Sequence, residues 1–264
     1  MCLALVAPPA DGLAATIQDD AGRTIRLDRP ATRIIALYGA FNEILAAMGL
    51  EDRIVARTEA DDQPSSILSK PSIGTHMRPN LELAVGLKPD LALQLAGRGA
   101  AGETAAALER HGVPTAVFEI ESLEDLYSVI ERLGQVTGAE DRAATLVADL
   151  RGRLGRVASA VAGAPRPSVF FEARYPNLLA AGGRSIVSDV IRAAGGRNCV
   201  ENPEKLVRLS EEELLRLNPD VYLLQRGAMN PDPSDPARRP HFQTLKAVRE
   251  GRTLVVDEQL FSRP

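Results

Sequence analysis

Residues 80–93 read Asn-Leu-Glu-Leu-Ala-Val-Gly-Leu-Lys-Pro-Asp-Leu-Ala-Leu, and residues 210–224 read Ser-Glu-Glu-Glu-Leu-Leu-Arg-Leu-Asn-Pro-Asp-Val-Tyr-Leu-Leu. Each stretch predicts a short amphipathic helix that ends at a Pro-Asp pair and is followed by an uncharged apolar run. Proline ends a helix at about the preceding residue, and such a run suits a strand covered on both faces. In both copies a glutamate, Glu82 or Glu212, precedes the proline by the same spacing. The duplication predicts two similar α/β lobes, although helix, Pro-Asp and strand also recur by chance in α/β proteins.

The segments around the repeat extend this prediction to the whole chain. Apolar runs predict further strands, and residues 122–163 read as helix with one break at Thr137-Gly138. A helix of about 20 residues spans about 30 Å and suits a strut between lobes. We expect mostly parallel, Rossmann-like sheets whose ligands lie outside the carboxyl ends of the strands. The expected order is a leader remnant or tail at 1–15, an N-terminal lobe at 16–121, a linking helical segment at 122–163 and a C-terminal lobe at 164–264.

Composition excludes several classes of protein. The chain has 264 residues, 45% of them hydrophobic and 25% charged, which is typical of a globular protein with two lobes. A net charge of −4 provides no basic field for nucleic acid, and no apolar run reaches membrane-spanning length. The two cysteines, Cys2 and Cys199, are too few for a disulfide framework.

The first 15 residues are similar to the end of a secretion signal, with a short apolar stretch before small residues at Gly12 and Ala14. We therefore expect a periplasmic or otherwise extracytoplasmic protein. Cys2 is a candidate for a lipid anchor, although no lipobox precedes it.

One motif favours an enzyme. Gly97, Gly99 and Gly102 form a G-x-G-x-x-G pattern between a predicted strand and a predicted helix, and Glu119 ends the next strand. This is the context of the dinucleotide-binding fingerprint, although that fingerprint normally lies in the first βαβ unit of a fold. An NAD-linked α/β oxidoreductase is therefore the alternative hypothesis.

Several stretches, in this order, resemble the class III periplasmic substrate-binding proteins of ABC importers for cobalamin, haem and ferric siderophores. They are Asp19-Asp20-Ala21-Gly22-Arg23, Pro30-Ala31-Thr32-Arg33-Ile34-Ile35, Asn42-Glu43-Ile44-Leu45-Ala46-Ala47-Met48-Gly49-Leu50, Pro79-Asn80-Leu81-Glu82, Leu87-Lys88-Pro89-Asp90-Leu91 and Gly195-Gly196-Arg197-Asn198. The resemblance implies two rigid lobes joined by one long helix, a ligand between them and no catalysis. It also implies that Glu82 and Glu212 dock onto arginines of the permease; alternatively, both only favour a helix dipole.

Two features depart from the family pattern. The family usually continues into a terminal helix after Gly-Pro-Arg, whereas this sequence stops at Pro264, so we expect an incomplete edge of the second lobe. Cobalamin-binding members have tryptophans around the cleft, whereas this chain has none and places His76 at one such position.

The loops expected at the cleft carry aromatic and basic side chains, namely Tyr38, His76, Met77, Arg78, Arg98, Arg174, Tyr175 and Arg226. Arginines pair bidentately with carboxylates and keep their charge, so they favour an anionic chelate such as haem, a ferric siderophore or a corrinoid. Some of them could instead cap helices or face water. His76, Tyr38 or Tyr175 could provide an axial bond to the chelated metal, although a lone loop histidine is often only solvated.

The histidine count argues against an importer of free divalent metal, which needs about four converging His, Asp or Glu ligands. The sequence therefore predicts a monomeric binding protein that delivers a metal chelate to an ABC permease and needs no catalytic cofactor.

Overall fold

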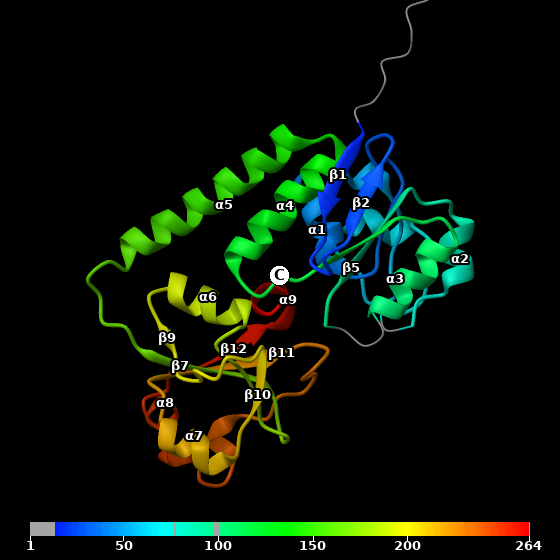
Figure 1. Ribbon diagram of the computed structural model, residues 1–264. Helices are drawn as coiled ribbons and strands as arrows, with labels where there is room; N and C mark the ends of the chain where they lie inside the picture. Colours follow the sequence, from blue (N-terminus) through cyan, green and yellow to red (C-terminus); the bar gives the residue numbers. More distant parts are fainter. Residues whose placement is uncertain (1–13, 77, 98–100, 264) are drawn as a thin grey trace, which may run out of the picture. The chain divides into compact units, whose positions relative to one another are not determined.

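The computed structural model describes residues 14–76, 78–97 and 101–263 (Figure 1). Contacts divide the chain into two compact units. Unit 1 comprises residues 1–119 and 128–147, and unit 2 comprises residues 120–127 and 148–264. Each unit has its own sheet, so the predicted α/β fold with two lobes is confirmed.

The sheet of unit 1 is parallel throughout its described strands. Its order is β4-β3-β5-β6, formed by Ile54–Ala56, Ile34–Ala36, Leu91–Leu95 and Thr115–Phe118. Every residue of β5 is buried, which confirms that the apolar run after the first Pro-Asp pair is a strand covered on both faces. The helices of this unit that follow or precede these strands are α1 (Gly39–Ala47), α2 (Leu81–Gly86) and α3 (Ala101–Arg110), with 3-10 turns at Glu51–Arg53 and Ser65–Ser69.

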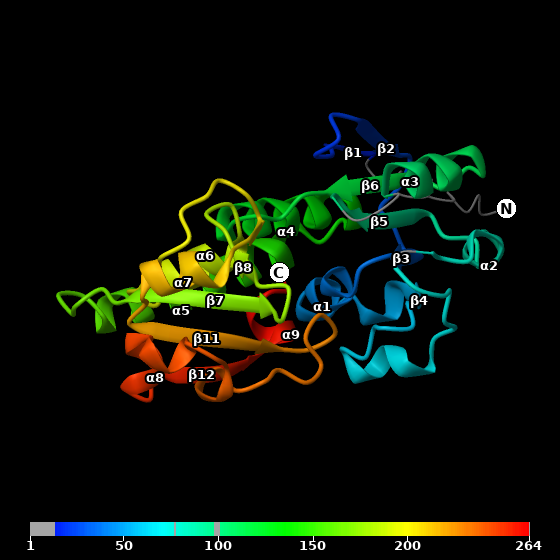
Figure 2. The ribbon, with the colours of Figure 1, turned by 90° about the horizontal axis from the view of Figure 1, so that it is seen from below.

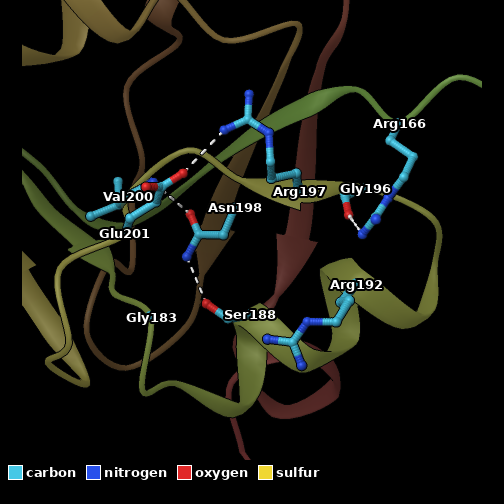
Figure 3. A pocket seen from close by; sticks show the side chains of 9 residues that line it. All are labelled: Arg166, Gly183, Ser188, Arg192, Gly196, Arg197, Asn198, Val200 and Glu201. Atoms are coloured by element: carbon cyan, nitrogen blue, oxygen red, sulfur yellow. Dashed lines mark hydrogen bonds and ion pairs between the residues drawn. The ribbon is translucent and has the colours of Figure 1, made fainter.

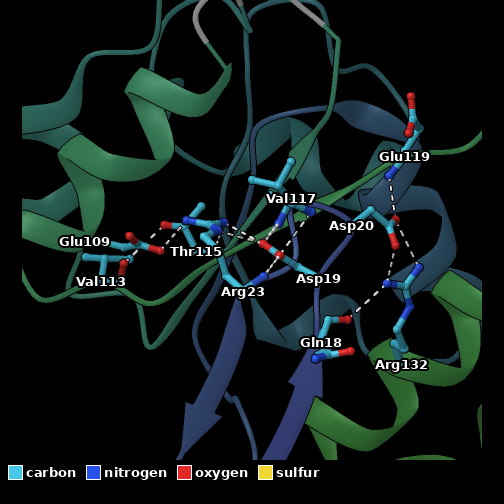
Figure 4. Close-up of polar contacts among 11 residues, drawn as sticks. Gln18, Asp19, Asp20, Arg23, Glu109, Val113, Thr115, Val117, Glu119 and Arg132 are labelled. Atoms are coloured by element: carbon cyan, nitrogen blue, oxygen red, sulfur yellow. Dashed lines mark hydrogen bonds and ion pairs between the residues drawn. The ribbon is translucent and has the colours of Figure 1, made fainter.

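A hairpin of β1 (Ala15–Gln18) and β2 (Thr24–Leu27) precedes this sheet. Its turn is held by two carboxylates (Figure 4). Asp19 is buried and accepts hydrogen bonds from Arg23 Nη2 at 2.6 Å and the backbone N–H of Val117 in β6 at 3.1 Å. Asp20 accepts from the N–H of Glu119 at 2.7 Å and from Arg132 Nη1 at 2.7 Å. These bonds fix the hairpin against the end of β6.

Two helices have residues in both units. They are α4 (Leu123–Thr137) and α5 (Glu140–Ala160), and the break between them lies at the predicted position. Ser122 and Asp125 form a reciprocal cap, because each backbone N–H donates to the other side chain at 2.9 and 3.0 Å. The 21 residues of α5 correspond to a length of about 30 Å.

The sheet of unit 2 is mixed. Its strands are β7 (Ser168–Arg174), β8 (Leu179–Ala181), β9 (Arg197–Asn198), β10 (Leu206–Arg208), β11 (Val221–Arg226) and β12 (Thr253–Asp257). They lie in the order β10-β8-β7-β11-β12, and β9 also pairs with β7. Figure 2 shows β7 beside β11 and β12, which run parallel to one another. The antiparallel strands β8 and β10 were not predicted.

The helices of unit 2 are α6 (Ile186–Ala193), α7 (Glu211–Leu217), α8 (Lys246–Arg249) and α9 (Glu258–Phe261). Residues 242–249 do not form one continuous helix. Leu245 has an extended backbone and separates a 3-10 turn, Phe242–Thr244, from α8.

The repeated segments fold alike. Residues 81–90 and 211–220 have the same pattern of burial, residue for residue. A polar side chain caps each helix: Asn80 accepts from the N–H of Leu83 at 3.0 Å, and Ser210 accepts from that of Glu213 at 3.2 Å.

The aspartate of each Pro-Asp pair also accepts hydrogen bonds from the backbone at or just before the start of the first strand of its unit's parallel set. Asp90 accepts the backbone N–H of Thr32 and of Arg33 before β3, and Asp220 accepts that of Ser168 at the start of β7. The repeat is therefore a unit of structure in both halves of the chain.

Candidate functional site

The carboxyl ends of the parallel strands are the expected position of a ligand site in each unit. In unit 1, Tyr38 follows β3 and has an extended backbone at the N-cap of α1. Its ring centroid lies 6.5 Å from that of His76, at an interplanar angle of 71°. Both side chains are half-buried. The structure therefore brings together two of the three residues that the sequence proposed as axial ligands.

The other predicted ligand-binding residues of unit 1 are Arg78, Met77 and Arg98. Arg78 is exposed, and its backbone N–H donates to Thr75 Oγ1 at 3.0 Å. Met77 and Arg98 lie outside the described residues.

In unit 2, two predicted arginines end neighbouring strands. Leu224 of β11 is paired with Glu172 of β7, and Arg226 and Arg174 each follow two residues later. Arg226 is exposed. Arg174 is half-buried, and its Nε is buried with no hydrogen-bond partner in the described part of the chain. An unpaired buried N–H of a charged group is costly, so Arg174 is suited to an anionic ligand group.

Tyr175 follows β7 directly and is already engaged within unit 2. Its hydroxyl donates to Glu211 Oε1 at 2.9 Å, and its ring packs edge-on against Phe242 at 5.9 Å between centroids. Burial, and then the hydrogen bond to Glu211, raise the pKa of Tyr175. Binding of a metal through the Tyr175 oxygen would therefore have to break the hydrogen bond to Glu211.

A buried ion pair beneath Tyr175 was missed by the sequence reading. Arg239 donates to both carboxylate oxygens of Glu172, at 2.5 and 3.0 Å, and Tyr222 donates to the same carboxylate at 2.5 Å. Burial, and then the negative charge of Glu172, raise the pKa of Tyr222 well above its usual value. Burial opposes the charge on Arg239, but the hydrogen bonds to Glu172, the negative charge of Glu172 and the nearby Tyr222 and Tyr175 together outweigh it and raise the pKa of Arg239. A signal was present, because Glu172 is a lone charge in the apolar run 169–173.

A hollow of about 230 Å³ in unit 2 lies at the opposite end of β7 (Figure 3). It is lined by three arginines, Arg166, Arg192 and Arg197, and Arg197 pairs with Ser168 at the first residue of β7. Arg192 forms an ion pair with Asp189, and Arg197 lies 3.4 Å from Glu201. The hollow is smaller than usual ligand pockets, and two of its arginines are paired. We therefore do not assign the ligand to it.

Glu82 and Glu212 each occupy the second residue of their helix, in α2 and α7, and both side chains are exposed. Their equal positions follow from the equal folds of the two repeats. Both are accessible to a partner.

Within residues 14–76, 78–97 and 101–263, no three His, Cys, Asp or Glu side chains gather as metal ligands. None of the helices in these ranges combines the length and apolar character required to cross a bilayer. Cys199 is buried, and burial raises the pKa of its thiol to about 12.

The dinucleotide motif lies partly outside the described residues, because Gly99 is not among them, whereas Gly102 is the second residue of α3. Glu119, its expected acidic partner, donates its backbone N–H to Asp20.

Comparison with known proteins places the chain among solute-binding proteins. The sequence profile of the family described as periplasmic binding protein matches residues 34–260. An uncharacterised ABC transporter substrate-binding lipoprotein of Bacillus subtilis is 25% identical, with 94% of this chain and 80% of the relative covered. A vitamin B12-binding protein of Vibrio campbellii is 26% identical, with 84% and 88% covered.

Two solved structures are similar over most of their length. A periplasmic heme-binding protein of Pseudomonas aeruginosa has a TM-score of 0.74 and 27% identity, with 88% of this chain and 86% of that chain covered. An ABC-type Fe3+-hydroxamate transport protein of Saccharomonospora viridis has a TM-score of 0.74 and 26% identity, with 94% and 92% covered. These similarities do not support the alternative of an NAD-linked oxidoreductase.

Proposed function

The chain belongs to the periplasmic binding protein family, and we propose from this premise that it captures a metal chelate outside the cytoplasm and delivers it to an ABC permease. It acts as a receptor and catalyses no reaction. The observation that carries the proposal is the family match over residues 34–260, which includes both repeats and both sets of strand ends. Relatives and similar structures are named for vitamin B12, heme and Fe3+-hydroxamate, which are all metal chelates.

The side chains at the strand ends suit a chelate with anionic groups. Arg174 offers a buried donor without a partner in the described part of unit 2, and Arg226 ends the neighbouring strand. A guanidinium pairs with a carboxylate or phosphate through two parallel hydrogen bonds. Arg78 and Arg98, together with Met77, complete the proposed ligand-binding set from unit 1.

Tyr38 and His76 are the proposed contacts to the chelated metal. Their rings lie 6.5 Å apart between centroids, and a phenolate or imidazole is a usual axial ligand for iron, while imidazole also suits cobalt. Tyr175 contributes its ring rather than its hydroxyl, because Glu211 already accepts from that hydroxyl.

Absorbance titration tests the ligand class. The protein is mixed with haemin, cyanocobalamin or a ferric hydroxamate siderophore. A separate titration with NADH tests the alternative of an NAD-linked oxidoreductase. We expect one chelate to bind and its visible absorbance band to shift. Binding of NADH alone would refute the proposed transport function. Tyr38→Phe and His76→Ala then identify the axial residue by the loss of that shift, with His111→Ala, an exposed residue at the end of α3, as the matched control.

Glu82 and Glu212 are the proposed contacts to the permease. Exposed ion pairs contribute little each, about 0.2–1 kcal/mol, and act mainly on encounter rate and orientation. We expect Glu82→Gln with Glu212→Gln to slow association with the permease and to weaken its dependence on salt. The matched control is Glu103→Gln, an exposed glutamate in the first turn of α3. Equal association rates for both variants would exclude the docking role.

The cellular location follows from the same function. We propose that the protein is exported and works as a monomer at the outer side of the cytoplasmic membrane. Cys2 is the proposed attachment point of a lipid if the protein is anchored.

A further inference from the structure

The buried carboxylate of Glu172 organises one end of the unit 2 sheet. Glu172 lies in β7, three residues before Tyr175, and its side chain has no exposed surface. It accepts hydrogen bonds from Arg239 and from the hydroxyl of Tyr222 in β11. A buried charge of this kind is tolerated only when it is paired and its oxygens are hydrogen-bonded.

Arg239 reaches this carboxylate from the long loop that follows β11. Its side chain is 3% exposed. Apart from Glu172, it donates through Nη2 to the backbone oxygen of Ser234 at 2.5 Å and through Nε to Ser234 Oγ at 3.1 Å. One guanidinium therefore ties the loop to the strand that ends at the candidate ligand site.

The same guanidinium also packs against the face of the Tyr175 ring. Arg239 Cζ lies 3.9 Å from the centroid of the Tyr175 ring and 5.3 Å from that of Phe242. A cation in this position is attracted to the face of the ring, and more strongly where water is excluded. With its ring stacked on Arg239 and its hydroxyl bound to Glu211 of α7, Tyr175 is fixed at two places.

We propose that Arg239 is a positioning residue for ligand binding, which holds Tyr175 at the ligand end of unit 2 without contacting the ligand itself. The inference rests on the proposed function and deepens it, since it divides the arginines of this end into two kinds. Arg174 and Arg226 are available to an anionic ligand, whereas Arg239 is fully engaged by Glu172, Ser234 and the Tyr175 ring. A side chain at a binding site keeps its geometry only where neighbouring groups lock its rotamer.

The test separates positioning from stability. Arg239→Met should weaken binding of whichever probe binds (haemin, cyanocobalamin or ferric hydroxamate) by roughly tenfold or more, and should also destabilise unit 2 by leaving Glu172 unpaired. In Glu172→Gln with Arg239→Met, neither member of this buried ion pair carries a charge, so the urea midpoint should return toward that of the wild type. Affinity should stay low, because Tyr175 still lacks its cation. If affinity returns with stability, Arg239 has a purely structural role and the proposal is wrong.

A second comparison asks whether Arg239 acts through Tyr175. Tyr175→Ala alone and combined with Arg239→Met should bind the probe equally weakly, because the second change removes a support that is no longer used. If the affinity losses of the two single variants multiplied in the double variant, Arg239 would contact the ligand directly, and the proposal would be overturned.

A third readout needs no ligand. The chain has four tyrosines and no tryptophan, so its near-ultraviolet circular dichroism is sensitive to tyrosine packing. Tyr222 also lies near Arg239, with its hydroxyl 3.4 Å from Arg239 Nη1, so it is replaced by Phe in every variant of this comparison. Within the Glu172→Gln, Tyr222→Phe background, Arg239→Met should change this signal, and the change should vanish when Tyr175→Phe is also present. A change that persists without Tyr175 would contradict the proposal. Failure of the wild type to bind any chelate would instead refute the proposed function, while this readout would still decide the role of Arg239.

Discussion

Asp220→Asn gives a sharp test of how the second Pro-Asp pair stabilises unit 2. One oxygen of Asp220 accepts both the backbone N–H and the hydroxyl of Ser168, each at 2.8 Å, and the other accepts from Lys246 Nζ at 2.6 Å. These bonds join the start of β7 to the start of β11 and to α8. Asparagine retains the shape but removes the charge, and its amide group faces the ammonium of Lys246.

The expected loss follows from the two bonds to Ser168. A hydrogen bond to a charged group contributes about 1.5–3 kcal/mol and a neutral one about 0.5–1.5 kcal/mol, so neutralisation costs about 1 kcal/mol per bond. The expected decrease in the free energy of unfolding is therefore about 2 kcal/mol. The exposed ion pair with Lys246 adds little to it.

The loss should depend on pH in a defined direction. Lys246, and then Ser168, hold the pKa of Asp220 well below its usual range. A carboxylate with a lowered pKa stabilises the fold fully above the pKa of the unfolded chain, about 3.9, and loses this contribution as the pH falls toward the folded value. The difference between the wild type and Asp220→Asn should thus be largest at neutral pH and shrink below about pH 4.

Urea unfolding followed by far-ultraviolet circular dichroism measures this difference at several pH values. Asp90→Asn is the matched variant in unit 1, where the carboxylate accepts from Thr32 and Arg33 and no lysine bond accompanies it. A loss below about 0.5 kcal/mol at neutral pH, or a loss that does not change between neutral and acidic pH, would refute the reasoning.

Three further predictions concern packing, burial and a buried charge. Gly182→Ala would place its Cβ 2.2 Å from the backbone oxygen of Glu204. The free energy of unfolding, measured by urea titration, should therefore fall by about 1–3 kcal/mol or more. The control Gly102→Ala in α3 has open space around its Cβ and should raise the free energy of unfolding by about 0.5–1 kcal/mol. In a Cys2→Ser background, the thiol of Cys199 should react with a disulfide reagent only as fast as the protein unfolds, because it is buried and its pKa is raised to about 12; rapid reaction in the folded state would contradict this. Asp19→Asn should lower the unfolding free energy by about 2–3 kcal/mol, since Asp19 accepts five hydrogen bonds, and a change within about 0.5 kcal/mol would show that the hairpin turn contributes little.

Local sequence predicted the parts of this fold that depend on local chemistry. Proline, an adjacent aspartate and an apolar run were sufficient to locate β5 and β11, because proline fixes its own backbone and an uncharged run has to be buried. The reciprocal cap of Ser122 and Asp125 was predictable for the same reason, since its partners are three residues apart.

Part of the candidate site was also predictable. Arg174 and Arg226 end strands, Tyr175 follows β7 directly and Tyr38 lies two residues after β3, and the carboxyl ends of parallel strands are the usual position of ligands. The closeness of Tyr38 and His76 was not determined by their spacing, because 37 residues that include α1 and β4 separate them.

The sequence by itself determined that this chain contains two related α/β halves, and it predicted which loops follow the carboxyl ends of their strands. Only the tertiary structure decided which charged groups of those loops remain available. Arg239 and Glu172 lie 67 residues apart, and nothing local distinguishes Arg239 from Arg226. The physical reason is that burial makes an unpaired charge costly, so the partner of Glu172 is selected by contact in the folded chain, and the arginine selected holds Tyr175 in place.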